Sequence, residues 1–260
     1  MTARLPVLVP QFNITWPRLP DNFILPDDPV ENTDHPLLAT ALRLALSDLP
    51  DKCDNALITS NFALCAAINS RMICKAPDWM YVQPVEPWLH SYPRRSYTPH
   101  TEGPIPTVVM EFLSETYGEE YSVESQQRIG KWLFYEQIIR VPTYVIFRPD
   151  TSHLEVYRLQ SERYQLQPPD ETGRYWITGL DLYLGLWEGS REGRTGSWLR
   201  WWSPQGEILV WPEEAREQER QRANLAEQRA EEEHQRAEEE RQRAERLAEK
   251  LRELGVNLED

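Results

Sequence analysis

The chain has 260 residues, 40% of them hydrophobic, and a formal net charge of −14. This size allows one sizeable core, with or without an appendage. The acidic balance excludes a broad basic face for tight, non-specific nucleic-acid binding, although a local basic groove is compatible with it. Cys53, Cys65 and Cys74 are too few and too irregularly spaced for a disulfide framework or a zinc ribbon. With no apolar run near the roughly 18 residues of a membrane span and no signal peptide, we expect a cytoplasmic protein without a membrane partner.

The first part of the chain predicts an arm, a helix and several strands. Residues 1–33 hold several prolines and no helical period, which indicates an irregular N-terminal arm. A helix is expected over 34–49, where Pro36 suits the first turn and Pro50 follows the last one. Short apolar runs then predict strands. They cover 56–58, 61–67, 78–82 and 106–114.

The next part predicts a helix over 123–140 and then two β-hairpins. The first hairpin joins 142–147 to 154–159, and the second joins 197–202 to 207–211. Two further short runs extend the sheet of the first hairpin, at 164–166 and 175–177. Because strands, a helix and strands follow one another without a regular βαβ repeat, the order predicts an α+β fold with a mixed sheet.

The composition changes beyond Pro212, where Gln-Arg-Ala recurs with a strict seven-residue period. One seam of this heptad holds Ala or Leu, but the other contains Glu233 and Glu240, where a coiled coil needs apolar residues. Three alternatives remain open for this segment. It could be a single charged helix in solvent, a weak coiled coil with a partner that zips at Leu247–Leu254, or disordered. The predicted organisation is an arm (1–33), a folded domain (34–212), a charged heptad helix (213–254) and a tail (255–260).

Glu111 is the most informative residue, because it lies in the middle of the apolar strand 106–114. A buried carboxylate is costly unless it is paired or holds a metal. Asp78 opens a second apolar strand, and two carboxylates on neighbouring strands could share a divalent cation. The five histidines are scattered and show no metal-ligand spacing. The carboxylates are therefore the candidate ligands of a metal-dependent hydrolase.

Three polar residues follow at intervals of four on the predicted helix, namely Gln127, Lys131 and Tyr135. They lie along one face, and a helix directly after the Glu111 strand can aim this face at the carboxylates. In a nuclease, Asp78 and Glu111 would hold Mg²⁺ or Mn²⁺, which lowers the pKa of a bound water. Lys131 would orient that water or neutralise developing charge, while Gln127 and Tyr135 would hydrogen-bond the backbone.

Several segments in this order resemble the Uma-type restriction endonuclease family, which is much expanded in cyanobacteria and belongs to the PD-(D/E)XK nuclease superfamily. The segments are 75–82, 108–114, 130–135, 141–147 and 154–159. The resemblance covers roughly residues 30–212 and implies a restriction-endonuclease-like sheet flanked by helices, with a metal site at its edge. It makes Asp78 the first acid, Glu111 the second, and Lys131 a lysine moved from the strand to the following helix. The Ala/Glu/Arg tail is also similar to a frequent appendage of this family.

Two positions depart from the pattern of the family. Leu113 stands where the superfamily has a lysine two residues after the acid, and Gln127 stands where many members carry an acid. Two hypotheses therefore stay open. One is a Mg²⁺-dependent endonuclease that hydrolyses phosphodiester bonds in DNA, with a homodimer as one arrangement for cutting both strands. The other is a catalytically weak or inactive nuclease-fold binding protein that assembles through its C-terminal helix.

A loop between the two acids, residues 88–100, interleaves basic and aromatic side chains. Arg94 and Arg95 could contact phosphates, and Tyr92 or Tyr97 could stack on bases. The alternative is a surface loop whose composition arose by chance.

Overall fold

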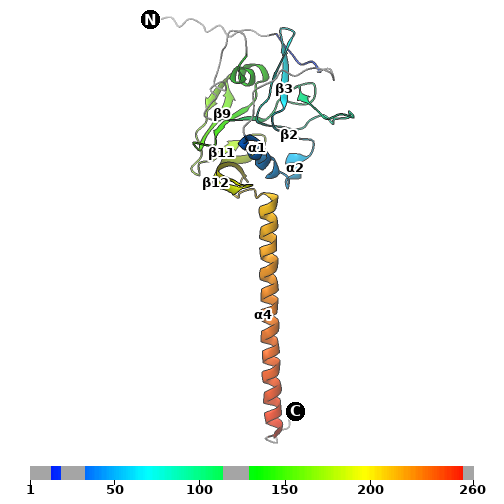
Figure 1. The fold of residues 1–260 in the computed structure, drawn as a ribbon, viewed down its shortest axis with the longest axis vertical. Coiled ribbons are helices and arrows are strands. Elements are labelled where there is room, and N and C mark those ends of the chain that lie inside the picture. The colour runs from blue at the N-terminus through cyan, green and yellow to red at the C-terminus, as the bar shows by residue number, and fades with distance from the viewer. Residues whose placement is uncertain (1–12, 19–32, 114–128, 254–260) are drawn as a thin grey trace. The chain divides into compact units, whose positions relative to one another are not determined.

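The computed structural model describes residues 13–18, 33–113 and 129–253 (Figure 1). The chain forms two compact units, residues 1–209 and 210–260. The first unit combines three sheets with short helices, and the second consists of a long helix. The predicted α+β class is therefore confirmed.

The central sheet of the first unit has six strands. Their order is β10 (Arg163–Leu166), β9 (His153–Gln160), β8 (Thr143–Arg148), β7 (Val108–Phe112), β5 (Trp79–Val82) and β2 (Leu57–Thr59). Only β7 and β8 run parallel, and the other neighbours in this sheet are antiparallel. Strands β5 and β7 are buried along their whole length, as expected for continuous apolar runs covered on both faces.

A second sheet contains β1 (Ile14–Thr15), β3 (Ala63–Ile68), β4 (Arg71–Lys75) and β6 (Ser96–Tyr97). Strands β3 and β4 form a hairpin, and its two turn residues, Asn69 and Ser70, have φ angles of 48° and 64°. Such left-handed pairs suit the right-handed twist of a tight hairpin. Strand β1 pairs with β3, so the arm predicted to be irregular contributes a short strand here.

The third sheet confirms the predicted second hairpin only in part. It contains β11 (Tyr175–Ile177), β12 (Leu182–Arg191) and β13 (Arg194–Trp202), and β13 pairs along its whole length with β12. Its pairing with the predicted partner 207–211 is limited to one antiparallel bridge, Trp202 with Ile208, and two neighbouring backbone hydrogen bonds. Strand β11 pairs with β12 and does not extend the central sheet. The turn between β12 and β13 is Glu192-Gly193, with φ angles of 49° and 79°. Gly189 weakens the strand pattern of β12, and the Trp187 ring lies where a Cβ at this position would stand, so a larger residue would displace that ring.

Helix α1 (Asp34–Leu44) ends before the predicted residue 49 and is followed by turns and by α2 (Pro50–Cys53). Of the predicted helix 123–140, residues 123–128 lie outside the described part of the chain. The described remainder is one α-helical turn, α3 (Lys131–Leu133), followed by a π-helix, η2 (Phe134–Ile139). The main core lies between η2 and the strands β3, β5, β7 and β8.

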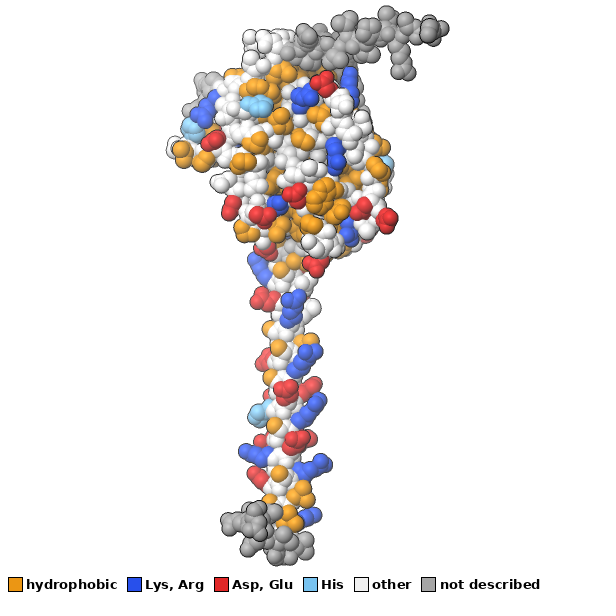
Figure 2. Space-filling view, turned by 180° about the vertical axis from the view of Figure 1, so that it is seen from behind, with side chains coloured by type: hydrophobic (Ala, Val, Ile, Leu, Met, Phe, Trp, Pro, Cys, Tyr) orange, Lys and Arg blue, Asp and Glu red, His pale blue; other side chains and the backbone are white. Residues whose placement is uncertain are grey.

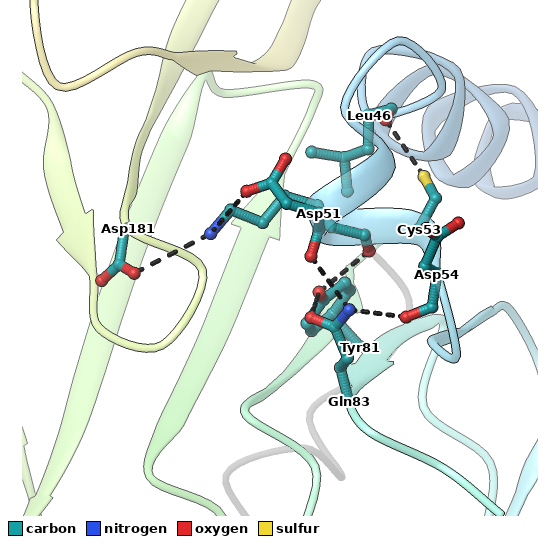
Figure 3. Close-up of polar contacts among 8 residues, drawn as sticks. Leu46, Asp51, Cys53, Asp54, Tyr81, Gln83 and Asp181 are labelled. Carbon is teal, nitrogen blue, oxygen red and sulfur yellow. Dashed lines mark hydrogen bonds and ion pairs between the residues drawn. The ribbon is translucent and has the colours of Figure 1, made fainter.

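Polar contacts fasten the end of β5 to α2 (Figure 3). The Tyr81 hydroxyl donates to the Lys52 carbonyl at 2.9 Å. The Gln83 amide donates to the carbonyls of Asp51 at 2.9 Å and Asp54 at 2.7 Å. These bonds hold β5, which begins directly after Asp78.

Helix α1 is fastened to β13, a strand that lies far away in the sequence. The Arg194 guanidinium contacts the Asp34 carboxylate at 2.7 Å. The Trp201 indole donates to the Leu42 carbonyl at 3.1 Å, and both of these side chains are buried. The first turn of α1 is therefore fixed by a residue of the third sheet.

The second unit is dominated by α4 (Pro212–Glu253). Glu214 accepts a hydrogen bond from the Trp211 amide at 2.8 Å, a capping contact, and Pro212 follows Trp211 as the first helical residue. Acidic and basic side chains alternate along the helix (Figure 2). Ion pairs one turn apart, such as Arg236 with Glu232, join some of them. No helix within the described residues is both long enough and apolar enough to cross a membrane.

Candidate active site

Asp78 directly precedes β5, Glu111 lies in the neighbouring strand β7, and the two carboxyl groups are close enough to interact electrostatically. Asp78 precedes β5, and in the antiparallel β5–β7 ladder Trp79 pairs with Met110. The next position in this register places Asp78 opposite Glu111. Opposite residues point to the same face, with Cβ atoms about 4.5–5.5 Å apart. Asp78 Oδ2 also accepts a hydrogen bond from the Phe112 amide at 2.6 Å, which fixes its carboxylate at the end of β7.

Glu111 has no exposed surface, and both of its carboxylate oxygens are contacted. Oε2 lies 2.9 Å from the Lys131 ammonium, and Oε1 accepts a hydrogen bond from the Tyr135 hydroxyl at 2.9 Å. Burial raises the pKa of Glu111 to about 8, although Lys131 acts in the opposite direction. The charge of Asp78 raises this pKa further. Burial and Asp78 thus disfavour the ionised form of Glu111, and a bound cation would stabilise that form.

Lys131 and Tyr135 reach Glu111 from the same side because α3 and η2 pack across the sheet. The predicted common face of these two residues is therefore observed. Burial raises the pKa of the Tyr135 hydroxyl well above its usual value, so this group remains a donor. π-Helical turns are rare and frequently occur at functional sites, which agrees with the place of η2.

The position two residues after Glu111 belongs to the core. Leu113 is buried among the apolar side chains of the main core, so a lysine there would have to bury its ammonium. The cation that pairs with Glu111 comes instead from Lys131. The predicted supporting residue Gln127 lies outside the described residues.

His35 is a residue of this site that the sequence interpretation missed. Its Nδ1 lies 3.8 Å from Asp78 Oδ1, and its ring packs edge-on against Phe112 at 5.8 Å. His35 stands in the first turn of α1, where no spacing relates it to the two acids. Only the packing of α1 brings it here, so no sequence signal could have found it.

The loop between the acids is folded on itself. The Arg94 guanidinium lies over the Trp88 ring at 4.9 Å and 3.8 Å from the Glu102 carboxylate. Tyr97 is fully buried, so the expectation that it stacks on a base is wrong. Tyr92 is half-buried and Arg95 is exposed. Phosphate contacts by Arg94 and Arg95 stay a prediction, with Arg95 the more accessible of the two.

The chemistry of the pair fits a hard divalent cation. Mg²⁺ and Mn²⁺ prefer oxygen ligands, and Asp78 and Glu111 supply carboxylates on one face of the sheet. Each carboxylate oxygen keeps a further lone pair beside its present hydrogen bond. Among residues 13–18, 33–113 and 129–253, no group of three or more His, Cys, Asp or Glu side chains has a metal-binding arrangement.

Comparison with known proteins places this chain among nuclease-like proteins. A family model, Uma2, described as "Putative restriction endonuclease", matches residues 18–192. The chain therefore belongs to this family, and the resemblance drawn from its motifs is confirmed. A solved structure of a putative nuclease belonging to DUF820 from Anabaena variabilis ATCC 29413 is 12% identical, with a TM-score of 0.39. That match covers 56% of this chain and 72% of the other chain. No curated protein matches the sequence.

Proposed function

We propose that the chain is an endonuclease that uses Mg²⁺ or Mn²⁺ to hydrolyse phosphodiester bonds in DNA. One observation carries this proposal, namely the pair of Asp78 and Glu111 on one face of the sheet with Lys131 at 2.9 Å from Glu111. Two acids and a lysine are the groups that metal-assisted phosphodiester hydrolysis needs. The family to which the chain belongs supports the same assignment.

Each residue of the site would have its own role in the reaction. Asp78 and Glu111 would hold the cation, which supplies a water of lowered pKa and offsets charge on the scissile phosphate. Lys131 contacts Glu111 in the free protein and would stabilise charge on the phosphate or orient the attacking water. Tyr135 fixes the orientation of Glu111 through its hydroxyl.

The first test is Mn²⁺ binding by titration calorimetry, together with cleavage of plasmid DNA in Mg²⁺ or Mn²⁺. Glu111→Gln keeps the shape of the side chain and removes its charge, so both binding and cleavage should disappear. Glu136→Gln is the matched control, because Glu136 is also a buried carboxylate but contacts Arg163 and the Tyr164 amide. A glutamine there loses the charge and keeps an oxygen that can accept the hydrogen bond from the Tyr164 amide, so the position of η2 is retained. This variant should bind Mn²⁺ and cut DNA like the parent chain.

Cleavage that survives Glu111→Gln would contradict the assignment of the site. Cleavage of RNA but not of DNA under the same conditions would support the assignment of the site and contradict DNA as the substrate. Equal loss in Glu111→Gln and Glu136→Gln would indicate general destabilisation, which unfolding curves of both variants would reveal.

A second candidate is a nuclease-fold binding protein without activity that assembles through α4. The burial of Leu113 favours it, because the superfamily lysine is absent from that strand position. Absence of Mn²⁺ binding in the parent chain would support this candidate. Deletion of residues 213–260 tests whether the chain assembles through α4. If this second candidate is correct, the shortened chain should no longer assemble.

A further inference from the structure

Cys65 and Cys74 stand directly opposite each other in the β3–β4 hairpin. The hairpin turn Asn69–Ser70 has two residues, so its closing pair, Ile68 and Arg71, is of the hydrogen-bonded kind. Pair types alternate along an antiparallel ladder, which makes the cysteine pair a non-hydrogen-bonded one. The Cα atoms of such a pair lie about 4.5 Å apart. Disulfides accept Cα separations of about 4.4–6.8 Å, so the hairpin geometry already suits a bond.

The two sulfur atoms already interact. Interaction with Cys65 lowers the pKa of the Cys74 thiol, although burial acts in the opposite direction. Interaction with Cys74, followed by burial, raises the pKa of Cys65. Cys74 is therefore the more nucleophilic partner, and it is also the more accessible one, with 9% of its surface exposed against 0% for Cys65.

The surroundings of the pair keep it apart from the main core. Cys65 and Cys74 pack with Ala63 and Met72 in a small cluster on the other face of β3. All three cysteines of the chain are present as free thiols. Joining the pair requires no repacking of the main core.

We propose that Cys65 and Cys74 are an oxidisable dithiol that a hydroperoxide converts into a cross-strand disulfide. The Cys74 sulfur attacks one peroxide oxygen, the O–O bond breaks, and hydrogen peroxide yields a sulfenic acid and water. The Cys65 sulfur then attacks the Cys74 sulfur, expels the second water and completes the S–S bond. Two thiols are oxidised and one peroxide is reduced to two waters.

The bond would stiffen the approach to Asp78. Strand β4 ends at Lys75 and leads through Pro77 to Asp78, and the Pro77 carbonyl accepts a hydrogen bond from the Asn61 amide at 3.0 Å. A disulfide between β3 and β4 would suppress opening of this hairpin. Oxidation of Cys65 and Cys74 does not require the chain to be a nuclease.

Peptide mapping of the full chain after treatment with hydrogen peroxide tests the proposal. Trypsin places Cys65 in the peptide 53–71, which also holds Cys53, and Cys74 in the peptide 72–75. The map is therefore made on Cys53→Ser as well as on the parent chain. Cys53 is the thiol with which the pair is compared, because it lies outside the β3–β4 hairpin and its Sγ donates to the Leu46 carbonyl at 3.1 Å (Figure 3).

The expected result is a link between the peptides 53–71 and 72–75 in both proteins, reversed by a thiol reductant. The oxidised chain should melt at a higher temperature than the reduced chain and exchange fewer amides in β3 and β4. Cys74→Ser should lose the link and the shift in melting temperature. If that variant does not fold, reduction of the oxidised parent must restore the lower melting temperature. A sulfinic acid at Cys74 without a link, or a link through Cys53, would overturn the proposal.

Discussion

Glu111 combines full burial with two donors and a neighbouring acid, and the balance among them determines its charge. Burial is the largest contribution and raises the pKa to about 8 from an ordinary value of 4.5. The folded chain therefore binds a proton at Glu111 over a pH range in which the unfolded chain has released it. Stability must fall as the pH rises through this range, since the unfolded state binds fewer protons there.

Glu111→Gln should abolish this pH dependence. In EDTA, the free energy of unfolding of the parent chain should decline between about pH 4.5 and pH 8 relative to the variant. The difference should reach on the order of 5 kcal/mol, because the pKa rises from 4.5 to about 8 and each pKa unit corresponds to about 1.4 kcal/mol. Urea unfolding at several pH values measures it. Parallel pH profiles of the two proteins would contradict the raised pKa.

Tyr135→Phe should affect Glu111 more than the fold. The change removes the hydroxyl that donates to Oε1 and leaves a buried acceptor unpaired, at a cost of about 1–3 kcal/mol. It should raise the pKa of Glu111 further, which NMR titration of the labelled carboxyl would detect. Tyr164→Phe is the control, since the Tyr164 hydroxyl donates to the Val141 carbonyl. An unchanged Glu111 pKa in Tyr135→Phe would refute the role of the hydroxyl.

The sequence pointed to part of this site and missed the rest for a physical reason. Glu111 and Asp78 stood out because acids in apolar strands are costly, and Lys131 and Tyr135 share a helical spacing. His35 carries no such local signal. Its distance from Asp78 is set by how α1 packs, and packing depends on residues far away in the chain.

At the scale of elements, η2 is fixed on the sheet by a second buried acid. Glu136 is 2% exposed, and its oxygens accept hydrogen bonds from the Tyr164 amide at 2.6 Å and from Arg163 at 3.1 Å. Since Tyr135 precedes Glu136, this contact also fixes the side chain that reaches Glu111. The active-site face of the helix thus depends on strand β10.

Glu136→Ala should destabilise the chain by about 1–3 kcal/mol, because the buried Tyr164 amide loses its partner. Amide exchange should accelerate in η2 and β10 and remain unchanged in β12 and β13. Arg163→Ala is the matched control. The Arg163 side chain is 55% exposed, so loss of its ion pair should cost less than about 1 kcal/mol. Equal destabilisation by both changes would contradict this account.

The strands were predicted better than their partners. Apolar runs located β5, β7, β8 and β9 to within about two residues, a normal error for boundaries. The predicted partner of β13 forms only one bridge with it, and the main partner, β12, was missed. Strand β12 contains Gly185 and Gly189, and glycine weakens the signal of a strand. Pairing also depends on turns, and Glu192-Gly193 is a weaker turn signal than Ser203-Pro-Gln-Gly206.

At the scale of the whole molecule, α4 differs from the first unit in what stabilises it. Its side chains are mostly exposed, including Leu225 and Leu247 at 48% and 56%. Pairs one turn apart contribute about 0.2–0.5 kcal/mol each and are weakened by salt. The glutamates at 233 and 240 interrupt the apolar seam that would hold two such helices together.

A fragment of residues 210–260 should therefore be helical and monomeric. Its helicity should fall between low salt and about 1 M salt, where the Debye length is about 3 Å. Circular dichroism and sedimentation over a wide concentration range measure both properties. Replacing Glu233 and Glu240 together with Leu completes the seam and should produce self-association. Self-association of the unchanged fragment would establish the coiled coil instead.

The contacts between α1 and β13 have a consequence for the order in which the protein becomes active. Asp34 and Arg194 are 160 positions apart, and Leu42 and Trp201 are 159 apart. A ribosome releases α1 early and β13 close to the end of the first unit. Until β13 emerges, these bonds cannot form and His35 is not held against Asp78. We expect a nascent chain to lack the complete arrangement of the candidate site until the first unit has been synthesised.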